Sequence, residues 1–506
     1  MQNTISKGSA METDSVSRFL GSYKFKRTGL FLGILAFILF SLISDMPHNA
    51  KFCAAIAILM SIWWVTEAVP LAVTSLVPLV LFPLSGVISG KDAAGAYTNS
   101  TIFLFLGGFI IALAMEKWNL HRRIALGLVS RFGKSPSTIV LSFMMAGGFL
   151  SMWISNTATA VMLLPIGMAI VSKMEDEHGA AATSNFSKAL MLSIAYAASI
   201  GGVATYIGTP PNLVFQRIYT QTFPNNPTVG FGQWIIYFFP LAVVLTVFVW
   251  WFLTKVMFRS DHKFVIDRSM MRREYDALGK TRYEEKVILT VFASAALLWI
   301  FREDIKAGAI MIPGWSNLFP NAGFIDDGTV SIFAALILFI IPKRAEKGEK
   351  GTIIDGWVIQ DIPWDVILLF GGGFALAEGF VKSGLSEQIG KSFDFASGMP
   401  LILIIFSISI IVTFLTELTS NTATAQIFLP ILAAFAIEWN INPLLLMLPA
   451  TISASMAFMM PVATPPNAIV FGSRKLHIAD MAKTGFIINI FGAVVITLLI
   501  YALLGT

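Results

Sequence analysis

Long apolar segments separated by short polar breaks run through nearly the whole chain of 506 residues. Many are close to the roughly 20 residues that a helix needs to cross a bilayer, and the ten-residue alternation of an outer-membrane barrel is absent. We therefore expect an all-α polytopic membrane protein. The pattern predicts about eleven membrane-spanning helices, at residues 29–45, 52–69, 71–88, 101–118, 188–217, 231–257, 287–302, 328–342, 364–381, 443–472 and 484–504.

Two further apolar segments, residues 137–173 and 400–437, each carry a polar hexamer in the middle. The first hexamer, Ser155–Ala160, is repeated letter for letter as Ser420–Ala425. A straight crossing would place the polar hexamer and any irregular backbone in lipid, where no water can hydrogen-bond to them. We therefore predict that each segment is a re-entrant hairpin whose tip is buried in protein.

Other motifs repeat at nearly the same spacing, which indicates that the chain is internally duplicated. Gly107–Phe109 returns as Gly372–Phe374, 265 residues later like the hexamer (155 to 420). Thr209–Asn212 returns as Thr464–Asn467, 255 residues later (209 to 464). The first half thus has ten extra residues, which we place in the polar stretch Glu175–Asn185. The two successive prolines of each Thr-Pro-Pro-Asn motif remove backbone donors, so we expect broken helices at 188–217 and 443–472.

The arrangement of these segments divides the chain into two halves of opposite orientation. A cytoplasmic tail, residues 1–27, precedes the first half at 28–257. A cytoplasmic loop at 258–286 joins it to the second half at 287–506. Five crossings separate equivalent positions, so the halves form an inverted repeat.

Composition and charge agree with a membrane location. The chain is 56% hydrophobic and 13% charged, with a mean hydropathy of +0.75, which leaves too little polar surface for a soluble protein of this size. The net charge of +5 comes from basic residues in the breaks between apolar segments, which is a topology signal and gives no indication of nucleic-acid binding. It predicts a multi-pass protein of the plasma (inner) membrane with its amino terminus in the cytoplasm and its carboxyl terminus outside. Cys53 is the only cysteine, so no internal disulfide can form.

The chemistry of a hairpin tip suits the binding of ions. Ser, Asn and Thr are good helix N-caps, and a tip that ends one half-helix and begins another leaves N–H groups on one side and C=O groups on the other. The N–H groups, aided by the helix dipole, face an anion, while the carbonyls can ligate a small hard cation. Two tips and two broken helices therefore predict one binding site near the middle of the bilayer.

These motifs resemble those of the divalent anion/sodium symporters, a family of dicarboxylate and citrate carriers. The resemblance rests on Trp63–Pro70, on both Ser-Asn-Thr motifs, and on Gly208–Asn212 with Ala463–Asn467, and it covers nearly the whole chain. It implies a homodimer in which a scaffold domain supports a transport domain that moves like an elevator. It also implies that the dicarboxylate is bound by Ser155, Asn156, Thr157, Thr209, Pro210, Ser420, Asn421, Thr422, Thr464 and Pro465. Two or more sodium ions are implied, at a first site of Ser151, Ser155, Asn156 and Gly208 and a second site of Thr416, Ser420, Asn421 and Ala463.

Sodium-coupled symport of four-carbon dicarboxylates (succinate, malate, fumarate) is the function that the resemblance favours. Some relatives exchange dicarboxylates without sodium, and an anion channel is an alternative from another class. We expect no enzymatic activity, because no His–Glu pair, Ser/His/Asp set or acidic dyad accompanies the motifs. Glu67, Glu378 and Glu417 lie in or near apolar segments, where an ionisable group suggests function. For Glu417 a hydrogen-bonded structural role competes with a role as ligand or helix-end partner.

Overall fold

The computed structural model describes residues 23–132, 135–260, 269–307, 310–344, 351–392 and 398–505. Helices dominate these residues, and nine of the described helices are long and apolar enough to cross a membrane. The prediction of a polytopic helical membrane protein is thus confirmed. The described residues also contain a short antiparallel hairpin, β1 (Ile305–Ala307) and β2 (Ile310–Ile312), that the sequence did not predict.

The helices follow one another in two similar series. The first series is α2 (Tyr23–Ile43), α3 (His48–Thr66), α4 (Leu71–Thr74), α5 (Val77–Ser85), α6 (Gly90–Gly95), α7 (Ser100–Lys117), α8 (Leu120–Phe132), α9 (Pro136–Ser151), α10 (Asn156–His178), α11 (Ala180–Val203), α12 (Pro210–Thr222), α13 (Phe231–Trp251) and the π-helix η1 (Phe252–Met257). A short helix, α14 (Ser269–Ala277), lies in the central loop. The second series is α15 (Tyr283–Ile300), the 3₁₀ turns η2 (Trp315–Leu318) and η3 (Ala322–Phe324), α16 (Asp327–Ile340), α17 (Trp357–Asp361), α18 (Trp364–Lys382), α19 (Leu385–Ser392), α20 (Leu401–Thr416), α21 (Asn421–Glu438), α22 (Leu444–Ser453), α23 (Pro465–Phe471) and α24 (Ile478–Leu504).

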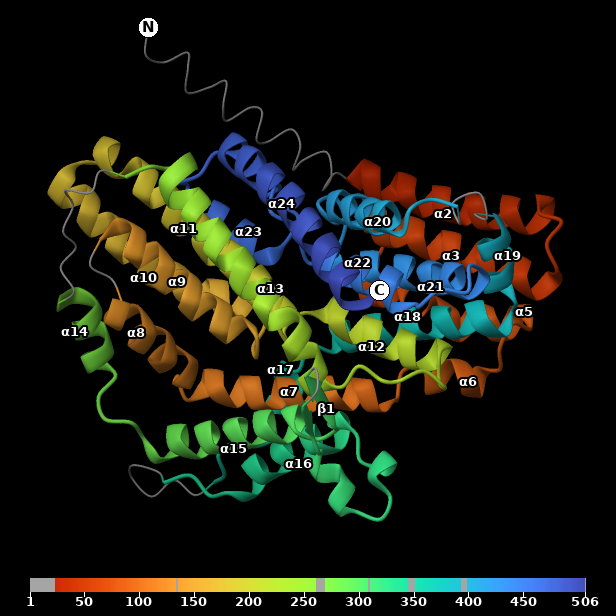
Figure 1. Cartoon of the computed structure of the whole chain (residues 1–506), viewed down its shortest axis with the longest axis horizontal. Helices are drawn as coiled ribbons and strands as arrows, with labels where there is room; N and C mark the ends of the chain where they lie inside the picture. The colour runs from red at the N-terminus through yellow and green to blue at the C-terminus, as the bar shows by residue number, and fades with distance from the viewer. Residues whose placement is uncertain are drawn as a thin grey trace, which may run out of the picture.

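Equivalent helices of the two series lie at opposite ends of the molecule. In Figure 1, α8 and α14 are at the left end, whereas α19, which is related to α8 by the 265-residue offset, is at the right end with α6. The α9–α10 pair occupies the left side and the α20–α21 pair the right side. This placement is what an inverted duplication produces.

Small residues let equivalent helices pack closely in both halves. A Cβ on Gly107 of α7 would lie 2.3 Å from the Ser331 hydroxyl of α16, and a Cβ on Gly372 of α18 would lie 2.5 Å from Ser75. Both distances are shorter than real Cβ contacts allow. The repeated glycines are therefore required for close helix packing.

The broken helices cross from one half to the other. Helix α12 of the first half packs against α21 and α22 of the second, and α23 of the second half packs against α10 and α11 of the first. Each hairpin is thus completed by a helix from the opposite half. The two hairpins and the two broken helices consequently form one interlocked block.

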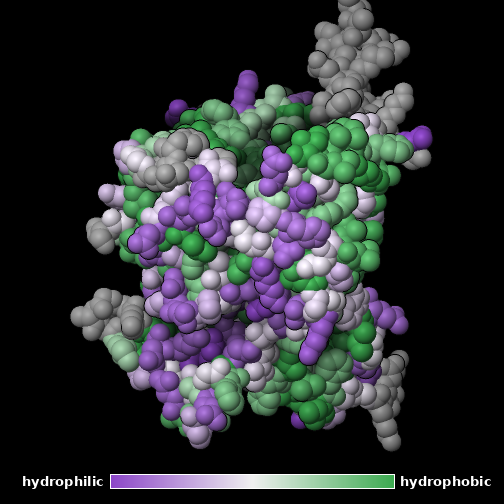
Figure 2. Space-filling model, turned by 90° about the vertical axis from the view of Figure 1, so that its right-hand side faces the viewer, coloured by the Kyte–Doolittle hydropathy of each residue, from purple (hydrophilic) through white to green (hydrophobic). Residues whose placement is uncertain are grey.

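The surface divides into polar and apolar regions. Figure 2 shows the end of the molecule at which α5, α6 and α19 lie, where hydrophilic side chains run down the middle and the lower left of the face and hydrophobic ones lie mainly at its top and right. Many large apolar side chains of α2, α13 and α24 are exposed, among them Leu42, Trp251 and Leu498. Exposed apolar side chains on long helices are expected where lipid is the solvent.

Three details differ from the expectations. Arg122, Arg123 and Arg131 belong to helix α8, whose mixture of charged and apolar positions lacks the apolar length of a membrane span; Lys134 lies outside the described residues. The segment predicted as one helix at 71–88 is two helices, because Pro78 near the start of α5 cannot donate the backbone hydrogen bond that would continue α4. The ten extra residues do lie near Glu175–Asn185, but they extend α10 and α11 beyond the predicted segments, which end at 173 and begin at 188.

Candidate functional site

The first hexamer lies where the chain leaves one helix and begins the next. Helix α9 ends at Ser151 and α10 begins at Asn156, so the backbone is not helical across residues 152–155. Ser155 is the N-cap of α10, and its hydroxyl accepts a hydrogen bond from the Ala158 N–H at 3.1 Å. Ser155 and Thr157 are exposed. The start of α10 therefore presents polar groups and a helix N-terminus at an accessible surface.

Asn156 ties this tip to the first broken helix. Its amide lies against the hydroxyl of Ser151. With its nitrogen directed inward, the amide donates to the carbonyl oxygens of Ala198 at 3.1 Å and Gly208 at 3.3 Å. Three of the residues assigned to the first sodium site, Ser151, Asn156 and Gly208, thus lie together.

The second hexamer is arranged in the same way. Helix α20 ends at Thr416 and α21 begins at Asn421, with Ser420 as the N-cap. The Thr416 hydroxyl lies 2.7 Å from Asn421 Oδ1 and 2.9 Å from the carbonyl oxygen of Ala454. Here Thr422 is buried, whereas Thr157, its counterpart in the first tip, is exposed.

Both Thr-Pro-Pro-Asn motifs begin a short helix after an unwound segment. Thr209 and Thr464 are N-caps in extended conformation, and the prolines that follow them occupy the first turns of α12 and α23, where no N–H partner is required. Pro210 is half-buried and Pro465 is exposed. The Thr464 hydroxyl accepts from the Asn467 N–H at 3.3 Å, which closes the cap.

The asparagine of each motif clamps the unwound segment in front of it. Asn212 Nδ2 donates to the carbonyl oxygens of Gly202 at 3.1 Å and Thr205 at 2.7 Å. Asn467 Nδ2 donates to the carbonyl oxygens of Ala457 and Met460 at 3.0 Å each. In both halves the two acceptors lie ten and seven residues before the asparagine. We did not assign these asparagines a role from the sequence, although their repetition was a sufficient signal.

The two halves meet at their breaks. The hydroxyls of Thr209 in the first half and Ser455 in the second are 3.4 Å apart and buried. A second buried contact joins the halves there, because the Tyr196 hydroxyl of α11 donates to the Phe458 carbonyl oxygen of the second break at 2.8 Å. Among the described residues, no hydrogen bond joins one hexamer to the other. Ala463, assigned to the second sodium site, is half-buried and donates its N–H to the carbonyl oxygen of Met460 at 3.2 Å.

Glu417 is buried beside the second tip, where it accepts hydrogen bonds from the backbone of the second break. The hydrogen-bonded structural role considered for this residue agrees with these contacts. Glu67 ends α3 in a left-handed conformation, as expected for a helix end, and Cys53 is buried. Glu378 forms an ion pair with Lys382 at 2.8 Å, one helical turn away.

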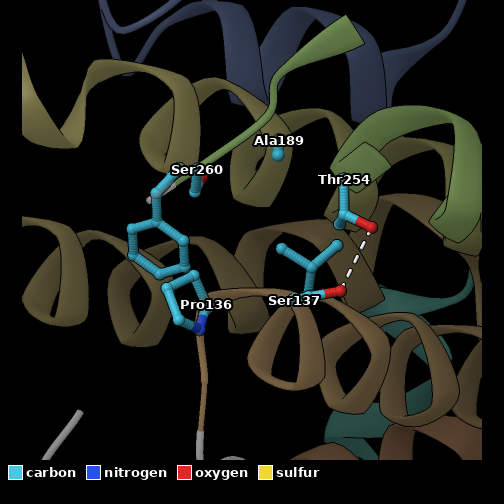
Figure 3. A pocket seen from close by; sticks show the side chains of 7 residues that line it. Pro136, Ser137, Ala189, Thr254 and Ser260 are labelled. Atoms are coloured by element: carbon cyan, nitrogen blue, oxygen red, sulfur yellow. Dashed lines mark hydrogen bonds between the residues drawn. The ribbon is translucent and has the colours of Figure 1, made fainter. Parts of the chain in front are cut away.

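The structure also contains a small cavity that is lined by residues outside these motifs. Pro136, Ser137, Ala189, Thr254 and Ser260 surround it, and the Ser137 hydroxyl donates to Thr254 Oγ1 at 3.1 Å (Figure 3). Its lining contains no charged side chain and none of the predicted site residues. The candidate site therefore rests on the geometry of the tips and breaks.

Comparison with known proteins places this arrangement in a family. The chain is 43% identical over 484 residues to the sodium-dependent dicarboxylate transporter SdcS of Staphylococcus saprophyticus, a match that covers 94% of this chain and 91% of the relative. It is 44% identical over 482 residues to SdcS of Staphylococcus aureus, covering 94% and 90%. The crystal structure of the YdaH transporter of Alcanivorax borkumensis, described as having an unusual topology, has a similar fold. Its TM-score is 0.55 at 13% identity, and the match covers 89% of this chain and 98% of that one.

Residues 24–505 match the family described as the sodium:sulfate symporter transmembrane region. The match spans both hairpins and both broken helices, and so includes every motif on which the resemblance rested. The chain therefore belongs to this family, the divalent anion/sodium symporters.

Proposed function

We propose that this protein is a sodium-coupled symporter of four-carbon dicarboxylates such as succinate, malate and fumarate. The names of the SdcS relatives support both the dicarboxylate and the dependence on sodium. The observation that carries the proposal is the repeated tie between a hairpin tip and an unwound backbone segment. Ser151 and Asn156 make it in the first half, and Thr416 and Asn421 in the second.

The dicarboxylate lies between the two tips. The N-termini of α10 and α21 both begin with Asn-Thr and have free N–H groups, so each can face one carboxylate of the substrate. Thr209 and Thr464 supply further donors from the breaks. The substrate-binding residues are Ser155, Asn156, Thr157, Thr209, Pro210, Ser420, Asn421, Thr422, Thr464 and Pro465.

Sodium ions bind on the other side of each tip, where carbonyl and side-chain oxygens gather. Sodium is a hard cation that prefers such oxygens, and no basic side chain occupies these positions. The first site consists of Ser151, Ser155, Asn156 and Gly208, and the second of Thr416, Ser420, Asn421 and Ala463. Two sodium ions would neutralise a dianion, which lowers the electrostatic cost of moving it through a medium of low dielectric constant.

Transport occurs by an elevator motion within a homodimer. The crossed packing of α12 on α21 and α22, and of α23 on α10 and α11, supports a transport domain that moves as one block. The scaffold is formed by the remaining helices, among them α7 with α15 and α16, which contact one another. The amino terminus is cytoplasmic and the carboxyl terminus is outside, in the plasma (inner) membrane, as the basic residues indicate.

Uptake of labelled succinate into proteoliposomes tests the proposal. An inward sodium gradient should drive accumulation, and replacement of sodium by potassium or choline should remove it. Uptake that ignores sodium but requires dicarboxylate inside the vesicle would contradict symport and identify an exchanger. Steady currents far above the turnover of a carrier would identify a channel.

A further inference from the structure

Glu417 is a buried carboxylate with an unusually complete set of donors. It directly follows α20 and is 3% exposed. Its Oε1 accepts from the N–H groups of Phe458 and Met459 at 2.7 and 2.8 Å and from Asn489 Nδ2 at 2.7 Å, and its Oε2 accepts from the Met460 N–H at 3.0 Å. All four partners are donors, and a protonated carboxyl would need an acceptor for its own hydrogen. These four donors favour the ionised carboxylate over the protonated acid.

This negative charge has no basic partner in the described part of the chain. It is held by dipoles: three backbone N–H groups and one amide. A buried carboxylate without a cation is costly, even when it is hydrogen-bonded. It lies at the C-terminal end of α20, where the helix dipole is also negative, so the local field attracts a cation.

The first half has no such charge. The 265-residue offset relates Glu417 to Met152, and the 255-residue offset relates Met460 to Thr205. In the first half the Thr205 hydroxyl donates to the Met152 carbonyl oxygen and accepts from the Gly208 N–H at 3.1 Å. In the first half a neutral hydroxyl thus makes the hydrogen bonds that hold the unwound segment, whereas in the second half a carboxylate does so.

The length of each break gives the reason. The first unwound segment covers residues 204–209, and the second covers residues 454–464. A longer unwound segment leaves more N–H groups without the carbonyl four residues earlier. One hydroxyl can serve a short break, whereas a carboxylate with several lone pairs can accept from three successive N–H groups.

The segment that Glu417 holds also carries part of the second cation site. Met460 donates its N–H to Glu417, while its carbonyl oxygen accepts from Ala463 N and from Asn467 Nδ2. Thr416 precedes Glu417 in the chain and bonds to Asn421 and Ala454. The carboxylate is therefore connected to Ala463 on one side and to Thr416 on the other.

We propose that Glu417 is a positioning residue and a fixed counter-charge for the second cation site, and that this site therefore binds sodium more tightly than the first. The inference rests on the proposed function, because it assumes that the two sites take sodium. The shape of the second break depends on the four hydrogen bonds of the carboxylate. The strength of its cation site depends on the charge.

The variant Glu417→Gln removes the charge and keeps the size of the side chain. Its amide oxygen can replace Oε1 and keep three of the four hydrogen bonds, while its NH2 group loses the bond from the Met460 N–H. Sodium activation of succinate uptake should shift to a sodium concentration roughly tenfold higher, while the KM for succinate at saturating sodium stays within about twofold of wild type. Glu417→Asp restores the charge at a shorter reach and should lie between the two. Glu378→Gln is the matched control, because Glu378 is a partly buried glutamate of α18 that pairs with Lys382; its sodium dependence should be that of wild type.

A second variant separates the charge from the closure of the break. Glu417→Met with Met460→Thr gives the second break the Met and Thr that stand at the equivalent positions 152 and 205 of the first half. Asn489→Leu is added because the Asn489 amide would otherwise lose its acceptor, the Glu417 carboxylate. If this triple variant folds, its sodium activation should shift like that of Glu417→Gln. Sodium binding is also read directly from the thermal stabilisation that sodium chloride gives the purified protein without substrate, with choline chloride as the reference.

A wild-type sodium curve in Glu417→Gln, or in the folded triple variant, would overturn the inference and leave the proposed function intact. Equal losses in sodium activation and in succinate KM would also overturn it, because they would show a general structural role. Sodium-independent uptake by the wild-type protein would instead contradict the proposed function itself.

Discussion

The break after α11 and the break after α22 share one plan and differ in how they are closed. In both breaks an asparagine, Asn212 or Asn467, donates to two backbone carbonyl oxygens. These belong to the residues ten and seven positions earlier in the chain. The first is completed by the Thr205 hydroxyl, the second by Glu417 and Asn489. The comparison teaches that the duplicated chain kept the groups that any unwound helix needs, and diverged where the length of the break changed the number of free N–H groups.

The helices that follow each motif show the same divergence. The 255-residue offset relates Asn489 of α24 to Trp234 of α13. Trp234 Nε1 donates to the Val203 carbonyl oxygen at 3.0 Å, whereas Asn489 donates to Glu417, which in turn accepts from Phe458, the counterpart of Val203. A large aromatic ring reaches the backbone directly in the first half, and a small amide reaches it through the carboxylate in the second.

The largest effect is expected from removing the amides that tie the tips to the breaks. Asn156→Ala and Asn421→Ala should each lower succinate uptake roughly a hundredfold, since each loses hydrogen bonds to charged ligands and to the site itself. The folded state should persist, as judged by a single elution peak in size-exclusion chromatography. Wild-type uptake in both variants would contradict the assignment of the site, and loss in only one would show that the halves contribute unequally.

Crowding at the first break predicts a difference between the halves. A Cβ on Gly208 would lie 2.5 Å from the Gly202 carbonyl oxygen, whereas the second half carries Ala463 at the equivalent position. Gly208→Ala should therefore destabilise the protein by about 3 kcal/mol and reduce uptake, while Ala463→Gly should retain most of it. Thermal unfolding and uptake measure the two effects. An alanine tolerated at position 208 would show that the first break can widen.

The asparagine clamps should behave alike in both halves. Asn212→Ala removes the donor from the Gly202 and Thr205 carbonyl oxygens. Asn467→Ala removes it from the Ala457 oxygen, while the Met460 oxygen keeps the Ala463 N–H. We expect a loss of about 2 kcal/mol in the free energy of unfolding for each variant. Asn225→Ala, at an exposed loop position, is the control and should change little. A much larger loss in one half would show that the clamps are not equivalent.

The indole of Trp234 offers a smaller test of the same comparison. Trp234→Phe keeps an aromatic ring but removes the N–H that bonds to Val203, so a loss of about 1 kcal/mol is expected in the free energy of unfolding. Denaturant titration of the purified protein can measure it. An unchanged stability would indicate that ring packing alone positions α13 against the break.

The smallest effect concerns α8, which carries His121 where α19 has Ser386. Burial lowers the pKa of His121 below its ordinary 6.5, opposed by a hydrogen bond to the Met115 carbonyl oxygen. A lowered pKa means that the folded state prefers the neutral ring, so this contribution is present above pH 6.5 and is lost as the pH falls. The stability advantage of wild type over His121→Gln should thus shrink between pH 7 and pH 5 by about a few tenths of a kcal/mol. An advantage that grows on acidification would reverse the sign of the shift.

The sequence alone predicted the features that depend on local composition and repetition. Apolar length set the spans, and the prolines after Thr209 and Thr464 placed both helix starts, because proline cannot donate to a helix and its effect needs no partner. Amphipathic helices such as α8 were missed, since an apolar face on a charged helix has low average hydropathy.

What the amino-acid sequence determined by itself was a doubled, lipid-embedded helical chain with two polar tips, since hydrophobic length, proline and letter-for-letter repetition are local properties. The tertiary structure decided which groups meet: Thr209 with Ser455, and Glu417 with the backbone from Phe458 to Met460. These contacts join residues far apart in the chain, and only the packing of one half against the other brings them within hydrogen-bond distance. The role of Glu417 could not be fixed from its position near a motif, because a buried carboxylate is defined by the donors that surround it.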